Sequence, residues 1–343
     1  MLAKLMASCP GLGQAIAGLG YDRHAPLCLL SSGLSNDNYV LGQGAAPRRQ
    51  HCHGVNDSHS EQCDGALSRL ALRVNRDVAA LGVGRVNEVW AWRQAASAGL
   101  APALVWVSQD YHCYLSQYVP NEPPESTNTA DSDSVLGRSG AMIVDLLGAR
   151  PPSEPSNSAV SRLGNLLCQL ATLPVPELTI STLEQWQRYD SALKAGMGDA
   201  PEGVQQGIYR ILERRTQILD WITTVTDAQQ GRLQFCHRDL NPANLLWSAQ
   251  KCLAIDFEYT CGAGPLNELA TVLATHNWSA PDTHWLCHEY LSKLGYATLP
   301  YKAIVAAVNI YWVFSCCWAL LQAAVHQEPQ YMTWFSQSEL MLS

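Results

Sequence analysis

Charged residues are scarce in this chain: they make up 15% of 343 residues, against 47% hydrophobic residues. Such a composition excludes a disordered protein and supplies a large core, enough for two domains or one large two-lobed unit. Acidic residues outnumber basic ones, and the net charge is −8. Because an acidic surface repels nucleic-acid phosphates, we expect no DNA or RNA partner. The sequence contains no internal repeat.

The twelve cysteines lack the regular spacings of a disulfide framework. Several of them, such as Cys168, Cys316 and Cys317, lie in apolar runs, where a reduced thiol packs as a small hydrophobic side chain. The first 20 residues have neither the basic start nor the cleavage site of a signal peptide. We therefore expect a cytoplasmic protein in a reducing compartment.

One apolar run, Ala303 to Val325, is long enough to span a bilayer. It is the only such run in the sequence. We therefore interpret it as a helix that is apolar on all sides and buried in a large domain, and we expect no membrane association.

The order of apolar and polar segments divides the chain into two parts. The first 119 residues predict a helix (1–24), two strands within 28–41, a strand at 70–74, a helix at 87–99 and strands at 104–107 and 113–119. Residues 42–67 are polar and predict a surface insertion, and residues 120–134 predict a linker or exposed loop. From residue 135 onward the pattern is mainly helical, except at 235–259.

That exception predicts a β-hairpin. Leu245 to Trp247 and Cys252 to Phe257 are apolar runs, and a short polar segment separates them. With the turn near Gln250, Asn244 and Asp256 lie opposite each other or one step apart, at the spacing of cross-strand neighbours. An amide and a carboxylate oxygen are ligands that Mg²⁺ accepts. We therefore predict a magnesium site formed by these two side chains.

Asp239 lies five residues before Asn244, in a loop that contains Pro242. A carboxylate in that position can accept the proton of an attacking hydroxyl, which is most of what phosphoryl transfer requires beyond positioning and charge neutralisation. His237 is a second candidate for the catalytic loop, although its ring can equally hold the loop by hydrogen bonds. Alternatively, these polar residues only cap a hairpin.

The series His237, Asp239, Asn244 and then Ile255-Asp256-Phe257-Glu258-Tyr259 resembles the choline/ethanolamine kinase and aminoglycoside phosphotransferase superfamily. The resemblance covers nearly the whole chain and is greatest to choline kinases and bacterial thiamine kinases. It implies an α+β, two-lobed, protein-kinase-like fold. A small β-rich N-lobe would comprise residues 1–119 and a larger, mainly helical C-lobe residues 120–343. It also implies Asp239 as base, with Asn244 and Asp256 as magnesium ligands.

The same resemblance implies a nucleotide site in the N-lobe. Gly33-Leu34-Ser35-Asn36 is similar to the phosphate-covering turn of the family, and Arg73 takes the place of the nucleotide-binding cation, with Arg76 as a competitor. Glu88 would pair with Arg73, or else is an ordinary acid in the first turn of a helix. Gln117 to Val119 would be the hinge that meets adenine.

For the acceptor, the resemblance implies a pocket on the helical lobe. Glu258 and the aromatic residues Tyr311, Trp312 and Trp318 suit a small cation through charge and cation–π attraction, although each aromatic residue could instead pack the core. We expect an ATP- and magnesium-dependent kinase for the hydroxyl of thiamine, choline or ethanolamine. The alternatives are an aminoglycoside kinase and a non-catalytic kinase-like binding module. The sequence gives no oligomeric state.

Two features depart from the family pattern. Glu268-Leu269-Ala270 stands where Asp-Leu-Ala is frequent, and the insertion at 42–67 is longer than usual. The insertion contains five histidines and cysteines whose spacing matches no established zinc site, so we expect a solvated loop rather than a metal centre: His51, Cys52, His53, His59 and Cys63.

Overall fold

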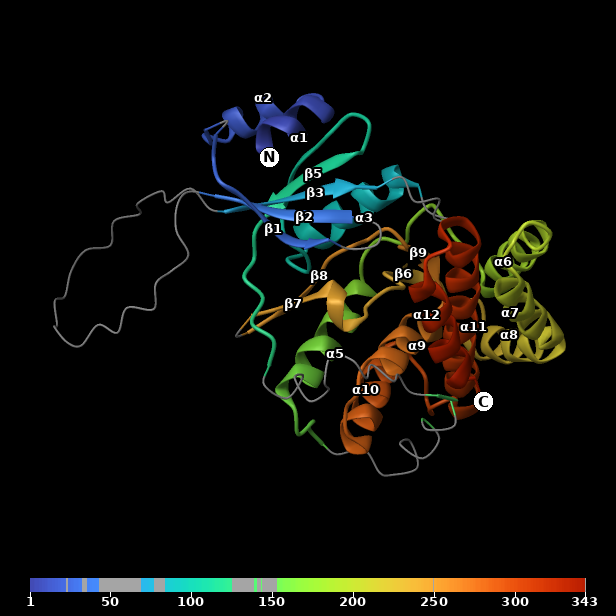
Figure 1. The fold of residues 1–343 in the computed structure, drawn as a ribbon. Helices are drawn as coiled ribbons and strands as arrows, with labels where there is room; N and C mark the ends of the chain where they lie inside the picture. Colours follow the sequence, from blue (N-terminus) through green and yellow to red (C-terminus); the bar gives the residue numbers. More distant parts are fainter. Residues whose placement is uncertain are drawn as a thin grey trace. The chain divides into compact units, whose positions relative to one another are not determined.

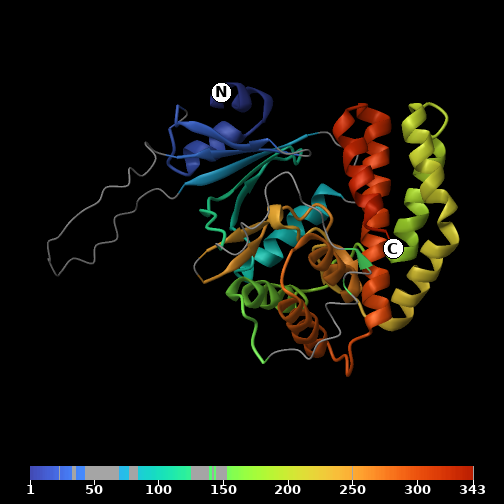
Figure 2. The same ribbon diagram turned by 60° about the horizontal axis from the view of Figure 1, so that its bottom comes forward.

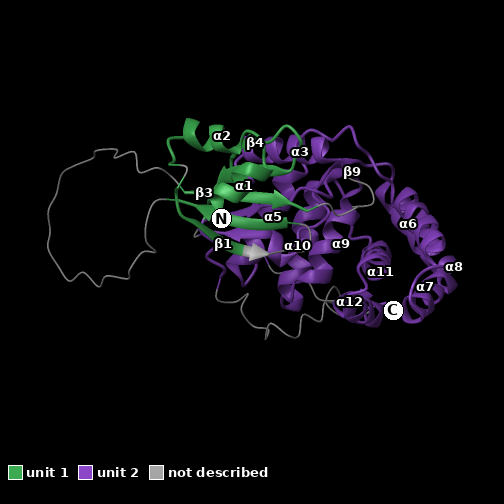
Figure 3. Cartoon of the chain, turned by 45° about the horizontal axis from the view of Figure 1, so that its top comes forward, with its two compact units in different colours: residues 1–79, 102–119 green, residues 80–101, 120–343 purple. Residues whose placement is uncertain are grey.

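The computed structural model describes most of the chain (Figure 1). The described residues are 1–22, 24–32, 36–42, 69–76, 84–124, 139–140, 143, 153–248 and 250–342. They divide into two compact units, coloured separately in Figure 3: residues 1–79 with 102–119, and residues 80–101 with 120–343. Most of the insertion at 42–67 and most of the linker at 120–134 lie outside the described residues.

The smaller unit is built on a five-stranded antiparallel sheet in the order β1-β2-β3-β5-β4. Its strands are β1 Leu27–Ser32, β2 Asn36–Leu41, β3 Leu70–Asn75, β4 Leu104–Val107 and β5 Cys113–Gln117. Each lies where the alternation of apolar and polar residues predicts a strand. The side chains of Leu41, Leu72 and Leu115, one from each of three neighbouring strands, are fully buried in the core of this unit.

The predicted helix at 1–24 is two short helices, α1 Leu2–Ser8 and α2 Leu12–Gly18. The single-helix prediction was wrong because Pro10 and Gly11 interrupt it. Gly11 has a φ of 85°, a left-handed conformation that glycine adopts without a steric penalty. Leu12 and Ile16 of α2 are buried in the same core as the sheet.

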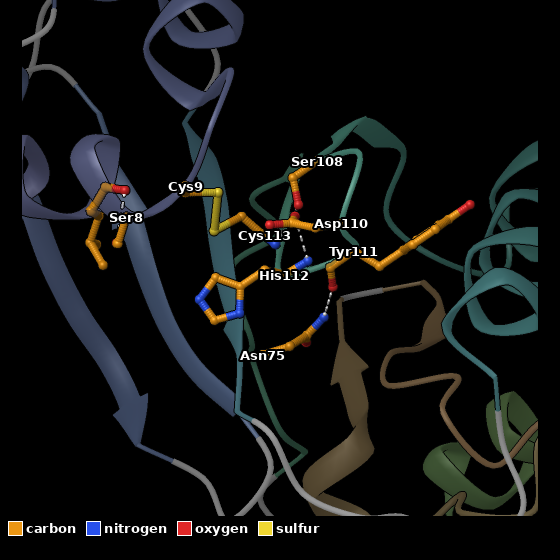
Figure 4. Close-up of a disulfide and its surroundings, with 9 residues drawn as sticks. Ser8, Cys9, Asn75, Ser108, Asp110, Tyr111, His112 and Cys113 are labelled. Atoms are coloured by element: carbon orange, nitrogen blue, oxygen red, sulfur yellow. Dashed lines mark hydrogen bonds between the residues drawn. A yellow bond between two sulfur atoms is a disulfide. The ribbon is translucent and has the colours of Figure 1, made fainter.

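A disulfide joins Cys9, which directly follows α1, to Cys113 in β5 (Figure 4). Both residues are fully buried, and their Cα atoms are 6.6 Å apart. The cysteine spacings did not indicate this bond, because the two residues are 104 positions apart in sequence. Disulfides persist mainly in oxidising compartments and are rare in the cytosol. This bond therefore counts against the expected cytoplasmic location, which stays a prediction.

The larger unit is mainly helical and also carries two small β-ribbons. Its helices are α3 Arg85–Ser97, α5 Ser158–Leu170, α6 Thr182–Gly196, α7 Glu202–Glu213, α8 Arg215–Gln229, α9 Pro265–Thr275, α10 Ala280–Lys293, α11 Tyr301–His326 and α12 Pro329–Leu340. The strands pair antiparallel as β6 Gln234–Cys236 with β9 Cys261–Ala263, and as β7 Leu245–Trp247 with β8 Cys252–Ala254. A 3-10 turn, η2, spans Pro242–Asn244.

Helix α11 is the long apolar run noted in the sequence. Among the described residues it is the one helix long and apolar enough to cross a membrane, and 67% of its most apolar window is buried inside the structure. It packs against α6, α7, α8, α9 and α12, and Figure 2 shows α12 beside it. These neighbours give α11 the apolar surroundings that a core helix requires.

Helix α3 lies within the predicted N-lobe in sequence but clusters with the larger unit. The reason is a set of contacts with the segment after β8. Asn87 Nδ2 donates to the Thr260 carbonyl at 2.6 Å, and the Trp92 and Phe257 rings stack with centroids 6.2 Å apart. The Ala254 N–H also donates to the Leu100 carbonyl, just beyond the helix, at 2.8 Å.

Candidate active site

The site begins in the loop between β6 and η2. Arg238 in this loop has a φ of 68°, a left-handed conformation that is costly for a residue with a side chain. Two side chains of α9 hold it: Glu268 Oε2 accepts the Arg238 N–H at 2.8 Å, and Thr271 Oγ1 donates to the Arg238 carbonyl at 3.3 Å. This turn presents the next residue, Asp239, beside η2.

Two asparagine amides hold the carboxylate of Asp239. Asn241 Nδ2 donates to Oδ1 at 2.9 Å, and Asn244 Nδ2 donates to Oδ2 at 2.6 Å. Asn241 Oδ1 in turn accepts the Ala243 N–H at 2.9 Å and so caps the η2 turn. Both carboxylate oxygens are therefore oriented by the short turn that Pro242 begins. The sequence analysis did not single out Asn241, since only contacts in three dimensions show its role.

The hairpin predicted at 245–257 is present. Leu245 pairs with Ala254, and the Ile255 N–H donates to the Asn244 carbonyl at 3.0 Å, which extends the ribbon by one position. Asp256 therefore lies one step beyond the position opposite Asn244, one of the two expected registers. Asp256 has a φ of 67°, so a second left-handed residue follows the ribbon where its ladder ends.

His237 connects the two segments. Its Nε2–H donates to the Ile255 carbonyl at 3.0 Å, and its Nδ1 accepts the Asp239 N–H at 3.3 Å. The ring also lies 4.7 Å from the ring of Phe257, centroid to centroid. Burial lowers the pKa of His237 to about 4, although the nearby Asp256 opposes this shift, so the ring is neutral at pH 7.

The carboxyl of Asp239 lies in a negatively charged, desolvated environment. Burial, followed by the negative charge of Asp256, raises its pKa to about 8. Glu258 adds to the increase, while the hydrogen bonds from Asn241 and Asn244 oppose it. Asp239, Asp256 and Glu258 thus form one acidic cluster, in which a bound cation would offset the repulsion.

The donor atoms of the predicted magnesium site fit a hard divalent cation. The two N–H groups of the Asn244 amide face Asp239, and within the described residues the amide oxygen accepts no hydrogen bond, so it can serve as a ligand. Asp256 supplies a carboxylate in the same acidic cluster. The three carboxylates of the acidic cluster interact through their charges but are not placed as a metal site by themselves, since the described part of the chain contains no group of three or more His, Cys, Asp or Glu residues placed to hold a metal. The five histidines and cysteines of the insertion lie outside it.

The predicted acceptor residues take different positions. Tyr311 of α11 lies close enough to Asp239 that the negative charge of Asp239 adds to the effect of burial in raising the pKa of Tyr311. Trp312 is buried beside it, with ring centroids 5.0 Å apart. Trp318 instead lies against Tyr331 and Trp334 of α12, with centroids 5.9 and 6.0 Å away.

Tyr259 is another aromatic residue near the acidic cluster that the sequence analysis did not select. Burial raises its pKa, and the charges of Glu258, Tyr189, Asp239 and Asp256 raise it further. In the sequence, the sign that Tyr259 lies near the site is its position directly after Glu258.

Glu88 and Glu258 share one cation within the larger unit. Arg85 Nη1 lies 2.8 Å from Glu88 Oε2 and 3.5 Å from Glu258 Oε2. The sequence analysis missed Arg85 because no motif contains it. The expected pair of Glu88 with Arg73 would join the two units and stays a prediction.

The predicted nucleotide residues of the smaller unit lie along its sheet, except for Ser35, which falls outside the described residues. Asn36 is buried at the start of β2, opposite Asn75 of β3. Arg73 is buried in β3, where Nε donates to Asn75 Oδ1 at 2.9 Å and the guanidinium lies 5.6 Å from the centre of the Tyr114 ring.

The competing cation Arg76 is bound to Asp37 Oδ1 at 2.7 Å, on the surface of the sheet. Gln117 ends β5, and its N–H donates to the Ala103 carbonyl at 2.8 Å. Val119 follows two residues later, at the boundary of the smaller unit.

Comparison with known proteins shows what this architecture is similar to. Three solved structures resemble the chain in fold. A choline/ethanolamine kinase family protein from Mesorhizobium loti has 18% identity and a TM-score of 0.62, covering 99% of this chain and 95% of the other. Choline kinase LicA from Streptococcus pneumoniae has 12% identity and a TM-score of 0.56, covering 98% of each chain. The ADP-bound aminoglycoside phosphotransferase APH(2'')-Ib has 12% identity and a TM-score of 0.56, covering 96% and 98%.

These neighbours confirm the predicted α+β, protein-kinase-like fold with a small β-rich part and a larger helical part. No curated protein sequence matches the chain significantly. The sequence model described as "Phosphotransferase enzyme family" matches residues 27–299, which include the sheet, the loop with Asp239 and the hairpin with Asp256. The chain therefore belongs to the phosphotransferase enzyme family.

Proposed function

We propose that this protein is an ATP- and magnesium-dependent kinase that phosphorylates the hydroxyl of a small cationic metabolite of the thiamine, choline or ethanolamine class. The observation that carries the proposal is the placement of Asp239. Its carboxylate is oriented by Asn241 and Asn244 and lies in one acidic cluster with Asp256. The proposed base, Asp239, is thus in contact with the amide of Asn244 and within the electrostatic influence of the Asp256 carboxylate.

The residues of the chain take distinct roles in this proposal. Asp239 accepts the proton of the attacking hydroxyl, and the amides of Asn241 and Asn244 keep its carboxylate in a fixed orientation. His237 ties the Asp239 loop to the end of the hairpin through the Ile255 carbonyl. Being neutral and buried, His237 acts here as a positioning residue rather than as a proton carrier.

Asn244 and Asp256 would hold the metal ion, and Asn36, Arg73, Gln117 and Val119 would contact the nucleotide. A magnesium ion supplies charge neutralisation on the transferred phosphate. The buried guanidinium of Arg73 is held by Asn75 and lies over Tyr114, which limits its freedom before a phosphate arrives. Ser35, which the sequence predicts to be part of a phosphate-covering turn, belongs to the same proposal.

For the acceptor, the carboxylate of Glu258 and the rings of Tyr311 and Tyr259 form the environment of Asp239. An anionic group next to aromatic faces attracts an ammonium or thiazolium ion. Trp312 lies beside Tyr311, whereas Trp318 contacts α12 and is the weakest of these acceptor candidates.

An aminoglycoside kinase is the second candidate. The observation that favours it is the grouping of three carboxylates, Asp239, Asp256 and Glu258, which would attract a polycation. The two candidates differ in the size and the charge of the acceptor and can be separated by assay.

The test is an acceptor screen with purified protein. ATP consumption is measured with Mg²⁺ and thiamine, choline, ethanolamine, homoserine or several aminoglycosides, and each phosphorylated product is identified by mass. We expect turnover with one small cationic alcohol, and a loss of at least about 10²-fold in the Asp239→Asn variant. Turnover with aminoglycosides alone would select the second candidate. A folded protein that binds ATP but phosphorylates nothing would favour a binding module and reject the proposal.

A further inference from the structure

Arg85 occupies a place that no motif of the chain assigns. It is the first residue of α3, and its Nη1 contacts the carboxylates of both Glu88 and Glu258, at 2.8 and 3.5 Å. Glu88 is completely buried and Glu258 is 7% exposed, whereas 28% of the Arg85 side chain reaches solvent. One partly exposed cation therefore contacts two buried anions, which are 170 positions apart in sequence.

Arg85 offsets repulsion between the two anions. Two buried carboxylates near one point repel each other, and a cation in contact with both lowers the energy of holding them there. Glu258 belongs to the segment that contains Asp256, so its position matters for the acidic cluster. Arg85 therefore contacts an anion of the metal-binding segment directly.

The neighbouring contacts show which parts Arg85 connects. Near Arg85, Asn87 Nδ2 donates to the Thr260 carbonyl at 2.6 Å. The first turn of α3 therefore contacts Glu258 and Thr260, the residues on either side of Tyr259. Asp256, the expected metal ligand, lies two residues before Glu258 in the same segment. Displacement of Glu258 would therefore be transmitted to Asp256 over a short stretch of backbone.

We propose that Arg85 is a positioning residue for phosphoryl transfer, which holds Glu258 and thereby sets the geometry of the metal-binding segment and the acceptor pocket beside Asp239. This inference rests on the proposed kinase function. It adds a residue that acts through Glu258 and does not touch the reacting atoms. It differs from a purely structural ion pair, which would change stability alone.

A double-mutant cycle tests the proposal. The variants are Arg85→Met, Glu258→Gln and their combination, with Arg85→Lys as the conservative replacement. Arg188→Met is the matched control, because Arg188 forms an exposed pair with Glu184 at 2.6 Å elsewhere in the same unit. The readouts are kcat, KM for ATP, KM for the acceptor found in the screen, and the folded fraction from circular dichroism.

We expect Arg85→Met to lower kcat by about tenfold or more, since a 1.4 kcal/mol change is tenfold, with a smaller change in KM for ATP. Arg85→Lys should recover part of the loss. In kcat, the double variant should be no slower than the slower single variant, because both substitutions remove the Arg85–Glu258 pair, while loss of the acceptor contact of Glu258 should appear in KM for the acceptor. Arg188→Met should keep the kcat of the wild type.

Three results would overturn the proposal: multiplicative losses in the double variant, an unchanged kcat in Arg85→Met, or a loss fully explained by unfolded protein. These outcomes are distinct from failure of the kinase function. If the wild-type protein phosphorylates no acceptor, both proposals fall. If the wild type is active and the cycle shows no coupling, only the role of Arg85 is rejected.

Discussion

Glu268 supports the loop of Asp239 and should make the stability of the larger unit depend on pH. Its side chain is buried on α9, where Oε2 accepts the N–H of the left-handed residue Arg238. Burial raises the pKa of Glu268 from 4.5 to about 7, against the opposing effect of hydrogen bonds from the backbone and the charge of Arg238. The folded protein therefore retains this proton at a pH where the unfolded chain releases it.

The sign and the size follow from linkage. Below pH about 4.5 both states are protonated, and the contribution of Glu268 to stability is fully present. It is lost as the pH rises toward and through 7, because ionisation then favours the unfolded chain. A pKa displaced from 4.5 to about 7 corresponds to about 3 kcal/mol, at about 1.4 kcal/mol per pH unit. The side chain is 1% exposed, so solvent screening takes little from this value.

Glu268→Gln is the variant that isolates the charge. Glutamine keeps an acceptor oxygen for the Arg238 N–H but has no titratable proton, whereas Glu268→Leu also removes the acceptor. The free energy of unfolding would be measured with urea at pH 5 and pH 8 for all three proteins. We expect the glutamine variant to gain about 2.5 kcal/mol relative to the wild type between these two pH values, because Glu268 of the unfolded chain is already mostly ionised at pH 5. Leucine should be less stable than glutamine at both.

The difference in the free energy of unfolding between the variant and the wild type cancels the contributions of the other titrating groups. His276, whose pKa burial lowers to about 4, is one of these groups. A difference between Glu268→Gln and the wild type that is equal at pH 5 and pH 8 would refute the reasoning. It would mean that Glu268 ionises in the folded protein as readily as in the unfolded chain.

Three other perturbations test separate parts of the molecule. Asp239→Ala should lower kcat by about 10²–10⁴-fold, the usual contribution of a general base, while ATP affinity measured by calorimetry stays within about threefold; retained turnover would exclude Asp239 as the base. Arg73→Ala should weaken ATP binding by about 10- to 100-fold, because a charge-assisted pair with phosphate is lost, and an unchanged dissociation constant would remove Arg73 from the nucleotide site. Cys9→Ser should lower the free energy of unfolding by about 2–4 kcal/mol, as would reduction of the wild type, because the disulfide closes a loop of 104 positions. The exposed Cys28 is the control, and a wild type that does not respond to reductant would show that the bond is absent from the protein in solution.

The centre of the site could be predicted from the sequence because its signals are local. Two apolar runs with a short polar segment between them define the hairpin, and counting from the turn places Asp256 within one step of Asn244. Local apolar patterns also predict the strands of the smaller unit. The helix break at Pro10 and Gly11 is local too, but the apolar spacing on both sides of it resembles that of one continuous helix.

Contacts between distant segments could not be predicted from the sequence. Arg85 and Glu258 are 173 positions apart, and no periodicity or turn signal couples them. The same holds for Cys9 and Cys113, and for the attachment of α3 to the larger unit through Asn87 and Thr260. Such contacts depend on how complete elements pack, and one sequence contains no measure of that packing.

The two left-handed residues of the site give a physical reason why its support extends beyond the catalytic residues. Arg238 and Asp256 each adopt a conformation that costs about 1–3 kcal/mol for a residue with a side chain, and both directly adjoin a group that must be placed accurately. Their neighbours are bound from elsewhere in the unit: Glu268 and Thr271 hold Arg238, while His237 holds Ile255 next to Asp256. If these contacts stabilise the two left-handed conformations, then substitutions that remove them should displace Asp239 and Asp256 and so lower kcat, even where the substituted residue does not touch the substrates. Arg85 and Glu268 are the positions where this consequence can be measured, because each has a conservative replacement that separates charge from shape.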